Sequence, residues 1–203
     1  MKIGIYGGSF DPIHMGHLIL AEHVRDSLGL SKIIFVPARI PPHVEAKALS
    51  PDEHRLAMVS VAMYDNPRFV CSDVELKRQG PSYTIETIRE FRRKYPHDDL
   101  HFIVGADSVR EFPNWKDPDQ IGGECRIVVG VRPGFEKSIF EELESSFSPE
   151  FIQSLKDNFV ETPAVDISST DIRQRIKEGK SIRHLVPVGV YDYIRTKNLY
   201  REC

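Results

Sequence analysis

The chain has 203 residues, of which 40% are hydrophobic and 28% charged, so it suits one globular domain and excludes a globally disordered chain. Its formal net charge of −3 argues against broad binding of nucleic acid. No apolar run approaches the roughly 20 residues of a membrane span, and we expect no signal peptide. The three cysteines, Cys71, Cys125 and Cys203, are too far apart and too few for a disulfide framework, so a cytoplasmic location is expected.

The chain opens with the pattern of a βαβ unit. Residues 2–6 predict a buried strand, residues 15–28 a helix that ends at Gly29, and residues 32–36 a second strand that stops at Pro37. A parallel pair of strands needs a crossover connection of this kind, which is usually a helix. The order therefore favours a parallel sheet.

Strands and amphipathic helices continue to alternate downstream. Ser50 is expected to cap a helix that has Pro51 at its first position. The residues expected on the inner face of that helix are Leu56, Val59, Ser60 and Met63. The later elements predicted are strands at 69–76, 100–104 and 126–131, a helix at 84–95, an acidic helical stretch at 133–161, a late strand or extended segment at 160–167, and helices at 171–178 and 188–196. The sequence therefore predicts an α/β fold, a Rossmann-like doubly wound parallel sheet with helices on both faces, in a single domain that spans 1–203.

Most of the negative charge lies in one segment. Residues 133–161 hold seven acidic and two basic residues, a net charge of −5, so the rest of the chain carries −3 minus −5, or +2. We interpret this segment as an acidic helical insertion. Four of its phenylalanines could pack a helical hairpin or form an oligomer contact, and we expect the hairpin: Phe135, Phe140, Phe147 and Phe151.

The turn between the first strand and the first helix is the strongest candidate site. It reads Gly7-Gly-Ser-Phe-Asp-Pro-Ile-His-Met-Gly-His17. Ligands of parallel sheets bind at the carboxyl ends of the strands, and a helix N-terminus there attracts phosphate. His14 and His17 share one helix face, so both can donate hydrogen bonds to phosphoryl oxygens, and Gly16 is expected to leave room for the ligand. Zinc binding is the alternative, but no third ligand follows at a telling spacing.

A second candidate phosphate site lies far downstream, in Ile167-Ser-Ser-Thr-Asp-Ile-Arg173. Ser168, Ser169 or Thr170 can cap the helix that begins here, and Arg173 can return its guanidinium to the same end. By itself the segment is equally explained as a helix cap with a surface arginine. It belongs to the C-terminal region 167–203, which we interpret as a phosphate-binding motif followed by helices.

Both segments resemble signatures of the adenylyltransferases of the nucleotidyltransferase superfamily. The first matches G-[ST]-F-D-P-x-H-x-G-H, and the second matches I-S-[ST]-T-x-[IL]-R, in the order of that family. The resemblance implies catalytic roles for His14 and His17 at the α-phosphoryl group of ATP. The residues that it implies for ATP binding are Gly8, Ser9, Phe10, His14, His17, Gly105, Asp107, Arg132, Ser168, Ser169, Thr170 and Arg173.

Further segments resemble the bacterial nicotinate mononucleotide adenylyltransferases. They are residues 41–43, 80–84, 105–107, 112–116, 132–134 and 198–200. In that family Trp115 would stack on the pyridine ring, and Thr84 with the backbone near Lys116 would hold its carboxylate. The residues implied for mononucleotide binding are Gly8, Ser9, His43, Ser82, Tyr83, Thr84, Trp115 and Lys116. Taken singly, Trp115 could equally be a core residue and residues 41–43 a rigid turn.

One position departs from the family pattern. A basic residue follows the Pro-Pro-His segment in many members, whereas Val44 stands there in this chain. Lys47 is a candidate replacement. The sequence does not decide between replacement by Lys47 and sufficiency of His43.

The resemblance implies transfer of the adenylyl group of ATP to nicotinate mononucleotide, giving nicotinate adenine dinucleotide and pyrophosphate in NAD biosynthesis. The expected route is direct in-line attack with no covalent enzyme intermediate. Magnesium is expected to arrive with ATP, and no resident metal, nucleic-acid or membrane partner is expected. Open alternatives are nicotinamide mononucleotide or phosphopantetheine as the acceptor, and a non-catalytic nucleotide sensor. The protonation states of His14 and His17 and a homo-oligomeric state stay open.

Overall fold

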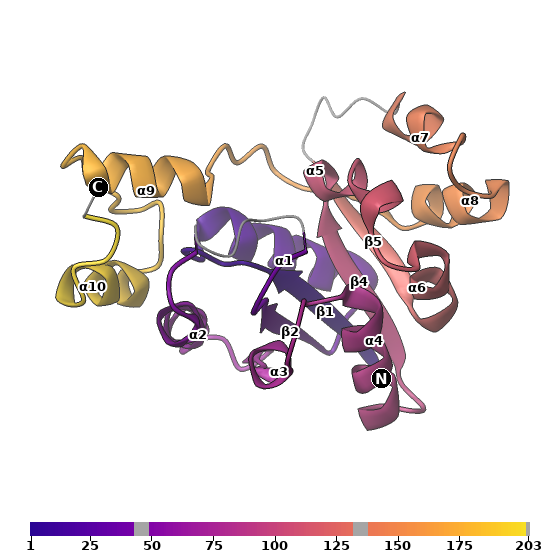
Figure 1. The fold of residues 1–203 in the computed structure, drawn as a ribbon, viewed down its shortest axis with the longest axis horizontal. Coiled ribbons are helices and arrows are strands. Elements are labelled where there is room, and N and C mark those ends of the chain that lie inside the picture. Colours follow the sequence, from indigo (N-terminus) through magenta and orange to yellow (C-terminus); the bar gives the residue numbers. More distant parts are fainter. Residues whose placement is uncertain (43–48, 132–137, 202–203) are drawn as a thin grey trace.

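The structure, a computed structural model, describes residues 1–42, 49–131 and 138–201, apart from the side chains of Asp107, Ser138 and Ile139. Its strands form one six-stranded sheet in the order β3-β2-β1-β4-β5-β6 (Figure 1). Every neighbouring pair is parallel. The order reverses between β1 and β4, which confirms the doubly wound prediction and marks the edge where ligands bind in such sheets. The strands are β1 (Lys2–Gly8), β2 (Lys32–Pro37), β3 (Phe69–Cys71), β4 (Asp99–Gly105), β5 (Arg126–Val131) and β6 (Phe159–Glu161).

Helices cover both faces of this sheet. Successive strand residues point to opposite faces, so Ile5 belongs to one buried cluster and Tyr6 to the other. The first cluster packs against α4 (Thr84–Lys94), α6 (Pro118–Glu124), α7 (Ser138–Leu143) and α8 (Pro149–Asp157). The second packs against α1 (Met15–Leu28), α2 (Asp52–Ala62), α9 (Ser169–Lys177) and α10 (Val188–Thr196). Figure 1 shows α9 and α10 at the end of the molecule opposite α7 and α8.

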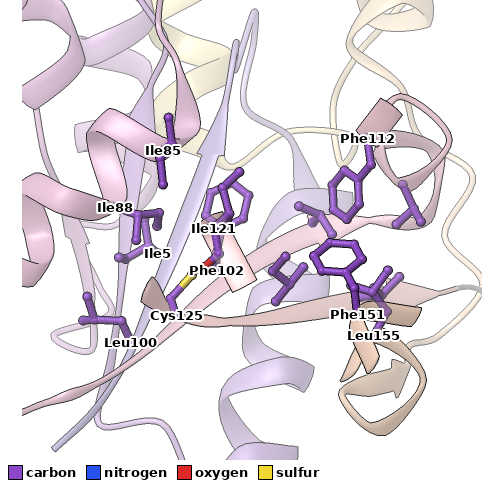
Figure 2. Packing of buried hydrophobic residues seen from close by; sticks show 14 of the residues in the cluster. Ile5, Ile85, Ile88, Leu100, Phe102, Phe112, Ile121, Cys125, Phe151 and Leu155 are labelled. Atoms are coloured by element: carbon purple, nitrogen blue, oxygen red, sulfur yellow. Dashed lines mark hydrogen bonds between the residues drawn. The ribbon is translucent and has the colours of Figure 1, made fainter. Parts of the chain in front are cut away.

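Aromatic side chains join α8 to the first cluster (Figure 2). Phe151 stacks on Phe147 with ring centroids 4.7 Å apart and meets Phe112 edge-on at 6.4 Å. Phe140 is also buried in this cluster. For these residues the intramolecular interpretation of the acidic segment is confirmed, whereas Phe135 lies outside the described residues. The segment is not helical to its end, because its last residues form β6.

Two expected strands are shorter than predicted. The strand expected at 69–76 ends at Cys71, and residues 74–77 form the helical turn α3 (Val74–Lys77) instead. Polar Glu75 explains the break, because its side chain turns inward to a hydrogen-bonding partner rather than pairing along the sheet edge. Likewise, the segment expected at 160–167 is a strand only through Glu161. Three short elements went unpredicted: α5 (Ala106–Val109), a 3₁₀ turn at Phe112–Asn114, and α6.

The helix α2 is shifted relative to its prediction. Pro51, not Ser50, occupies the capping position, because the Ser50 N–H donates to the carboxylate of Asp11. Ser60 is exposed and Leu56 only partly buried, so the expected inner face was wrong at these two positions. The residues that α2 buries are Arg55, Met58, Val59 and Ala62. In the part of the chain that the structure describes, no helix is long and apolar enough to cross a membrane.

Candidate functional site

A cavity of about 740 Å³ opens at the carboxyl edge of the sheet. Its lining includes the last residues of β1 and β4, the start of α1, the start of α4 and the segment that precedes α9. Thirteen residues predicted for the site line it together: Gly8, Ser9, Phe10, His14, His17, Ser82, Tyr83, Thr84, Gly105, Trp115, Lys116, Ser168 and Ser169.

The other predicted site residues fall into two groups. Thr170 and Arg173 are described but are not among the residues that line the cavity. Asp107 lies in α5 with its side chain outside the description, and His43 and Arg132 lie outside the described residues, as do Val44 and Lys47. The roles implied for Asp107, His43 and Arg132, and the candidate role of Lys47, stay predictions.

His14 and His17 form a stacked pair at the start of α1. Their ring centroids are 3.7 Å apart, and His14 is buried. The backbone N–H of His14 donates to Nδ1 of His17 over 3.2 Å, so that nitrogen accepts and the neutral ring carries its proton on Nε2. Burial, and then the charge of His14, lower the pKa of His17 well below its usual value. The site therefore holds a neutral His17 whose Nε2–H is the hydrogen-bond donor.

Gly16 gives room to the histidine pair. A Cβ at this position would lie 3.1 Å from Cε1 and Nδ1 of the His14 ring, closer than side chains normally pack. Gly16 also lines the cavity, and the expectation that it leaves room for a ligand stays a prediction. A Cβ on Gly105 would meet nothing within 4 Å, so a ligand can approach the backbone there.

A buried residue, Asp11, joins the two candidate phosphate segments through its backbone. Arg173 Nη1 donates to the Asp11 carbonyl oxygen at 2.7 Å. The Asp11 carboxylate binds two other segments: its Oδ2 accepts from the Ser50 N–H at 3.0 Å, and its Oδ1 accepts from the Tyr200 hydroxyl at 2.6 Å. Segments more than 150 residues apart in the sequence thus meet at one residue.

The start of α9 contacts the loop between β1 and α1, which contains Asp11. The Ser169 hydroxyl donates to the Pro12 carbonyl at 2.8 Å. The Ser168 hydroxyl caps the helix, accepting from the Asp171 N–H at 3.0 Å and donating to the Asp171 carboxylate. Both hydroxyls are therefore used inside the protein. What remains for an anion is the first backbone N–H groups of α9, which no helical carbonyl can satisfy.

Arg55 is a structural residue of the site that the sequence reasoning missed. It is fully buried, and its guanidinium donates to the carbonyl oxygens of Ser9 at 2.9 Å, Ala38 at 2.6 Å and Ser50 at 3.0 Å. It also pairs with Asp52. The loop after β1 is thereby fixed to the end of β2. If the inner face of α2 had been predicted one residue earlier in the sequence, Arg55 would have been placed inward. Hydrophobic periodicity does not predict this, because Arg55 is charged.

The part of the cavity that borders the first buried cluster, rather than the second cluster beside His17, is aromatic, and we call it the aromatic end. Half-buried Trp115 meets Phe112 and Phe102 edge-on, with ring centroids 4.8 and 6.0 Å apart. Lys116 Nζ lies 4.3 Å from the centroid of the Tyr83 ring and 2.9 Å from Glu86 Oε1. The chain enters α4 beside them, so the first N–H groups of this helix give the aromatic end a partial positive charge.

Near β5 and β6 the cavity has an apolar wall to which the sequence reasoning assigned nothing. Gly130 lies against Leu20, whose side chain is 3.1 Å from where a Cβ would be. Thr162 is anchored by its N–H and its hydroxyl, which both donate to the Val131 carbonyl. The wall is suited to a flat heterocycle. The sequence signal that could have predicted this wall is its position after two parallel strands, β5 and β6. The residues concerned are Leu20, Gly130, Thr162, Pro163, Val165 and Ile167.

The described residues contain no group of three histidine, cysteine or acidic side chains that could hold a metal ion. The carboxylates that line the cavity are Glu75, near the aromatic end, and Glu111. The described lining therefore offers hydroxyl and amide groups, rather than a carboxylate cluster, beside the histidine pair.

Comparison with known families and sequences agrees with these features. The family model described as cytidylyltransferase-like matches residues 5–175. A protein of Moorella thermoacetica named "probable nicotinate-nucleotide adenylyltransferase" is 44% identical over 201 residues, which cover 98% of this chain and 92% of the relative. A protein of the same name from Thermus thermophilus is 43% identical, covering 99% of this chain and all of the relative.

Solved structures show the same fold. The Plasmodium falciparum nicotinic acid mononucleotide adenylyltransferase complexed with NaAD superposes with a TM-score of 0.76 at 19% identity, covering 98% of this chain and 97% of the other. The same enzyme complexed with APC gives 0.74. At this identity the likeness concerns the fold, and it supports the Rossmann-like architecture derived from the strand order.

Proposed function

The chain belongs to the cytidylyltransferase-like family and, within it, to the nicotinate-nucleotide adenylyltransferases, and we propose from this premise how its cavity performs their reaction. The protein transfers the adenylyl group of ATP to nicotinate mononucleotide, in NAD biosynthesis, giving nicotinate adenine dinucleotide and pyrophosphate. The single observation that carries the proposed mechanism is the two-ended cavity, with the histidine pair beside one end and Trp115 at the other.

The two substrates enter from opposite ends. The adenine of ATP lies on the apolar wall near Gly130 and Thr162, and its β- and γ-phosphates face the first N–H groups of α9. The pyridine ring stacks on Trp115, while Thr84 and the N-terminus of α4 hold its carboxylate. Support comes from the lining of one continuous cavity by all of these groups.

The chemistry is a direct displacement at the α-phosphorus. The attacking group is a phosphate oxygen of the mononucleotide, which is already anionic near neutral pH, so no general base and no protein nucleophile are required. His17 donates Nε2–H to an α-phosphoryl oxygen as negative charge develops there, and His14 contacts the same group. The protein contributes alignment and charge stabilisation.

Magnesium is part of the substrate in this proposal. It enters on the phosphates of ATP, a binding mode that the ion favours because it keeps several waters and needs few protein ligands. The lack of a metal-binding cluster among the described residues fits this mode.

The substrate preference is tested by pyrophosphate release with ATP and magnesium. Nicotinate mononucleotide, its amide and phosphopantetheine are compared by kcat/KM. We expect the nicotinate form to react best, because the N-terminus of α4 favours a carboxylate over a neutral amide. A higher kcat/KM for the amide would overturn the proposed carboxylate site, and a higher value for phosphopantetheine would overturn the whole placement of the acceptor.

A further inference from the structure

A buried carboxyl group lies at the aromatic end of the cavity and has no role in the mechanism above. Glu75, in the single turn α3, lines the cavity yet is only 6% exposed. Its Oε1 accepts a hydrogen bond of 2.6 Å from the hydroxyl of Thr87, which is itself buried in the first turns of α4. A buried carboxyl is costly unless it is hydrogen-bonded, so this position calls for an explanation.

The hydrogen bonds around Glu75 form an ordered chain. Arg78 Nη2 donates to the Thr87 hydroxyl oxygen at 2.9 Å, so the single hydroxyl proton of Thr87 is directed to Glu75. Burial raises the pKa of Glu75, and the nearby hydroxyls of Thr87 and Ser82 act in the opposite sense, as do the charges of Arg78 and Arg55. Glu75 therefore interacts with hydroxyl groups on both sides of Tyr83 and Thr84.

The other contacts of Ser82 extend this chain to the neighbouring loop. The Ser82 hydroxyl oxygen accepts from the Arg39 N–H at 2.9 Å, and the Ser82 N–H donates to the Ile40 carbonyl at 2.8 Å. Ser82, just before Tyr83, and Thr87, about one turn into α4, are thus held, while the side chains of Tyr83 and Thr84 border the cavity.

We propose that Glu75 is a positioning residue for the pyridine subsite: by accepting the hydrogen bond of the Thr87 hydroxyl, close to Ser82, it fixes the start of α4 and sets Tyr83 and Thr84 against the nicotinate ring. This inference rests on the proposed placement of the pyridine ring beside Trp115. The role of Glu75 is indirect, because its Oε1 is engaged by the Thr87 hydroxyl inside the protein.

The test separates positioning from general stability by comparing the two substrates. Glu75→Ala and Thr87→Val each remove the bond between the two side chains, whereas Glu75→Gln keeps an acceptor for Thr87. Glu124→Gln is the control, because Glu124 pairs with Arg89 and does not line the cavity. We expect KM for nicotinate mononucleotide to rise about 10-fold in the first two variants, as for loss of one buried hydrogen bond. KM for ATP should stay within about twofold of wild type, and Glu75→Gln should restore KM for the mononucleotide.

Three outcomes would overturn the inference: an unchanged KM for the mononucleotide in both Glu75→Ala and Thr87→Val, an equal rise for both substrates, or failure of Glu75→Gln to restore it. If Glu75→Ala does not fold, Thr87→Val and Glu75→Gln carry the test. Trp115→Ala, measured in parallel, distinguishes this inference from the proposed function. A normal KM for the mononucleotide in Trp115→Ala means that the pyridine placement itself is wrong.

Discussion

The two ends of the cavity are built in different ways. The phosphate end comes mainly from one continuous stretch, Gly7–His17, to which the start of α9 is joined through Asp11. The aromatic end is assembled from α3, the start of α4 and residues 112–116, which meet only in the folded chain. The phosphate end is accordingly a local property of the sequence, whereas the aromatic end depends on tertiary contacts. The predictions below test whether the two ends also work separately.

The largest expected effect belongs to Arg55, which fixes the loop after β1 to the end of β2. Arg55→Ala leaves the carbonyl oxygens of Ser9, Ala38 and Ser50 without their donor, so the free energy of unfolding should fall by about 3–5 kcal/mol. Urea unfolding measures it. Arg25→Ala, which breaks a surface pair with Glu22, is the control and should cost less than about 1 kcal/mol. Equal losses in the two variants would contradict the structural role of Arg55.

The next effect is confined to the phosphate end. His17→Ala should lower kcat by about 100-fold or more, as for loss of one donor to a developing oxyanion, with little change in KM for the mononucleotide. His23→Ala is the matched control, since His23 lies on the exposed side of the same helix. An unchanged kcat in His17→Ala, in steady-state pyrophosphate release, would remove His17 from the chemistry.

A smaller effect should mark the aromatic end. Trp115→Ala should raise KM for nicotinate mononucleotide about 10-fold, because the stacking surface is lost, and leave KM for ATP nearly unchanged. Trp115→Phe should recover part of the loss. Equal increases for both substrates would mean that the two ends do not act separately.

The smallest effect is a pH dependence that has opposite signs at the two ends. Because the pKa of His17 is lowered in the folded chain, His17 is protonated at a higher pH in the unfolded chain than in the folded one. The contribution of His17 to stability is therefore present above about pH 6.5 and lost as the pH falls. The raised pKa of Glu75 means that its contribution is present in acid and lost as the pH rises above about 4.5.

Unfolding free energies measured against pH check both signs. As the pH falls from about 7.5 to 5.5, the unfolding free energy of His17→Gln should rise relative to that of wild type. As the pH rises from about 4.5, the unfolding free energy of Glu75→Gln should rise relative to that of wild type. Parallel curves for a variant and wild type would show that the group has the same pKa in the folded and unfolded chain.

What the sequence could predict depends on how each residue acts, at both ends of the cavity. The sheet, the α1 turn and both phosphate segments were predictable, because periodicity and short-range motifs carry them. Glu75, Arg55 and Tyr200 were not, because each acts by a buried polar contact with residues distant in the sequence or in a loop. The strand expected at 69–76 failed for this reason, since Glu75 turns inward to Thr87 instead of extending β3.

The central claim is that each end of the cavity recognises one substrate, and Trp115 reports on it directly. It is the chain's only tryptophan, so tryptophan emission, excited selectively over tyrosine, comes from the aromatic end alone. Titration with nicotinate mononucleotide should change the Trp115 emission in a saturable way, and titration with magnesium and ATP alone should leave it unchanged. A comparable saturable change with ATP, or none with the mononucleotide, would contradict the account.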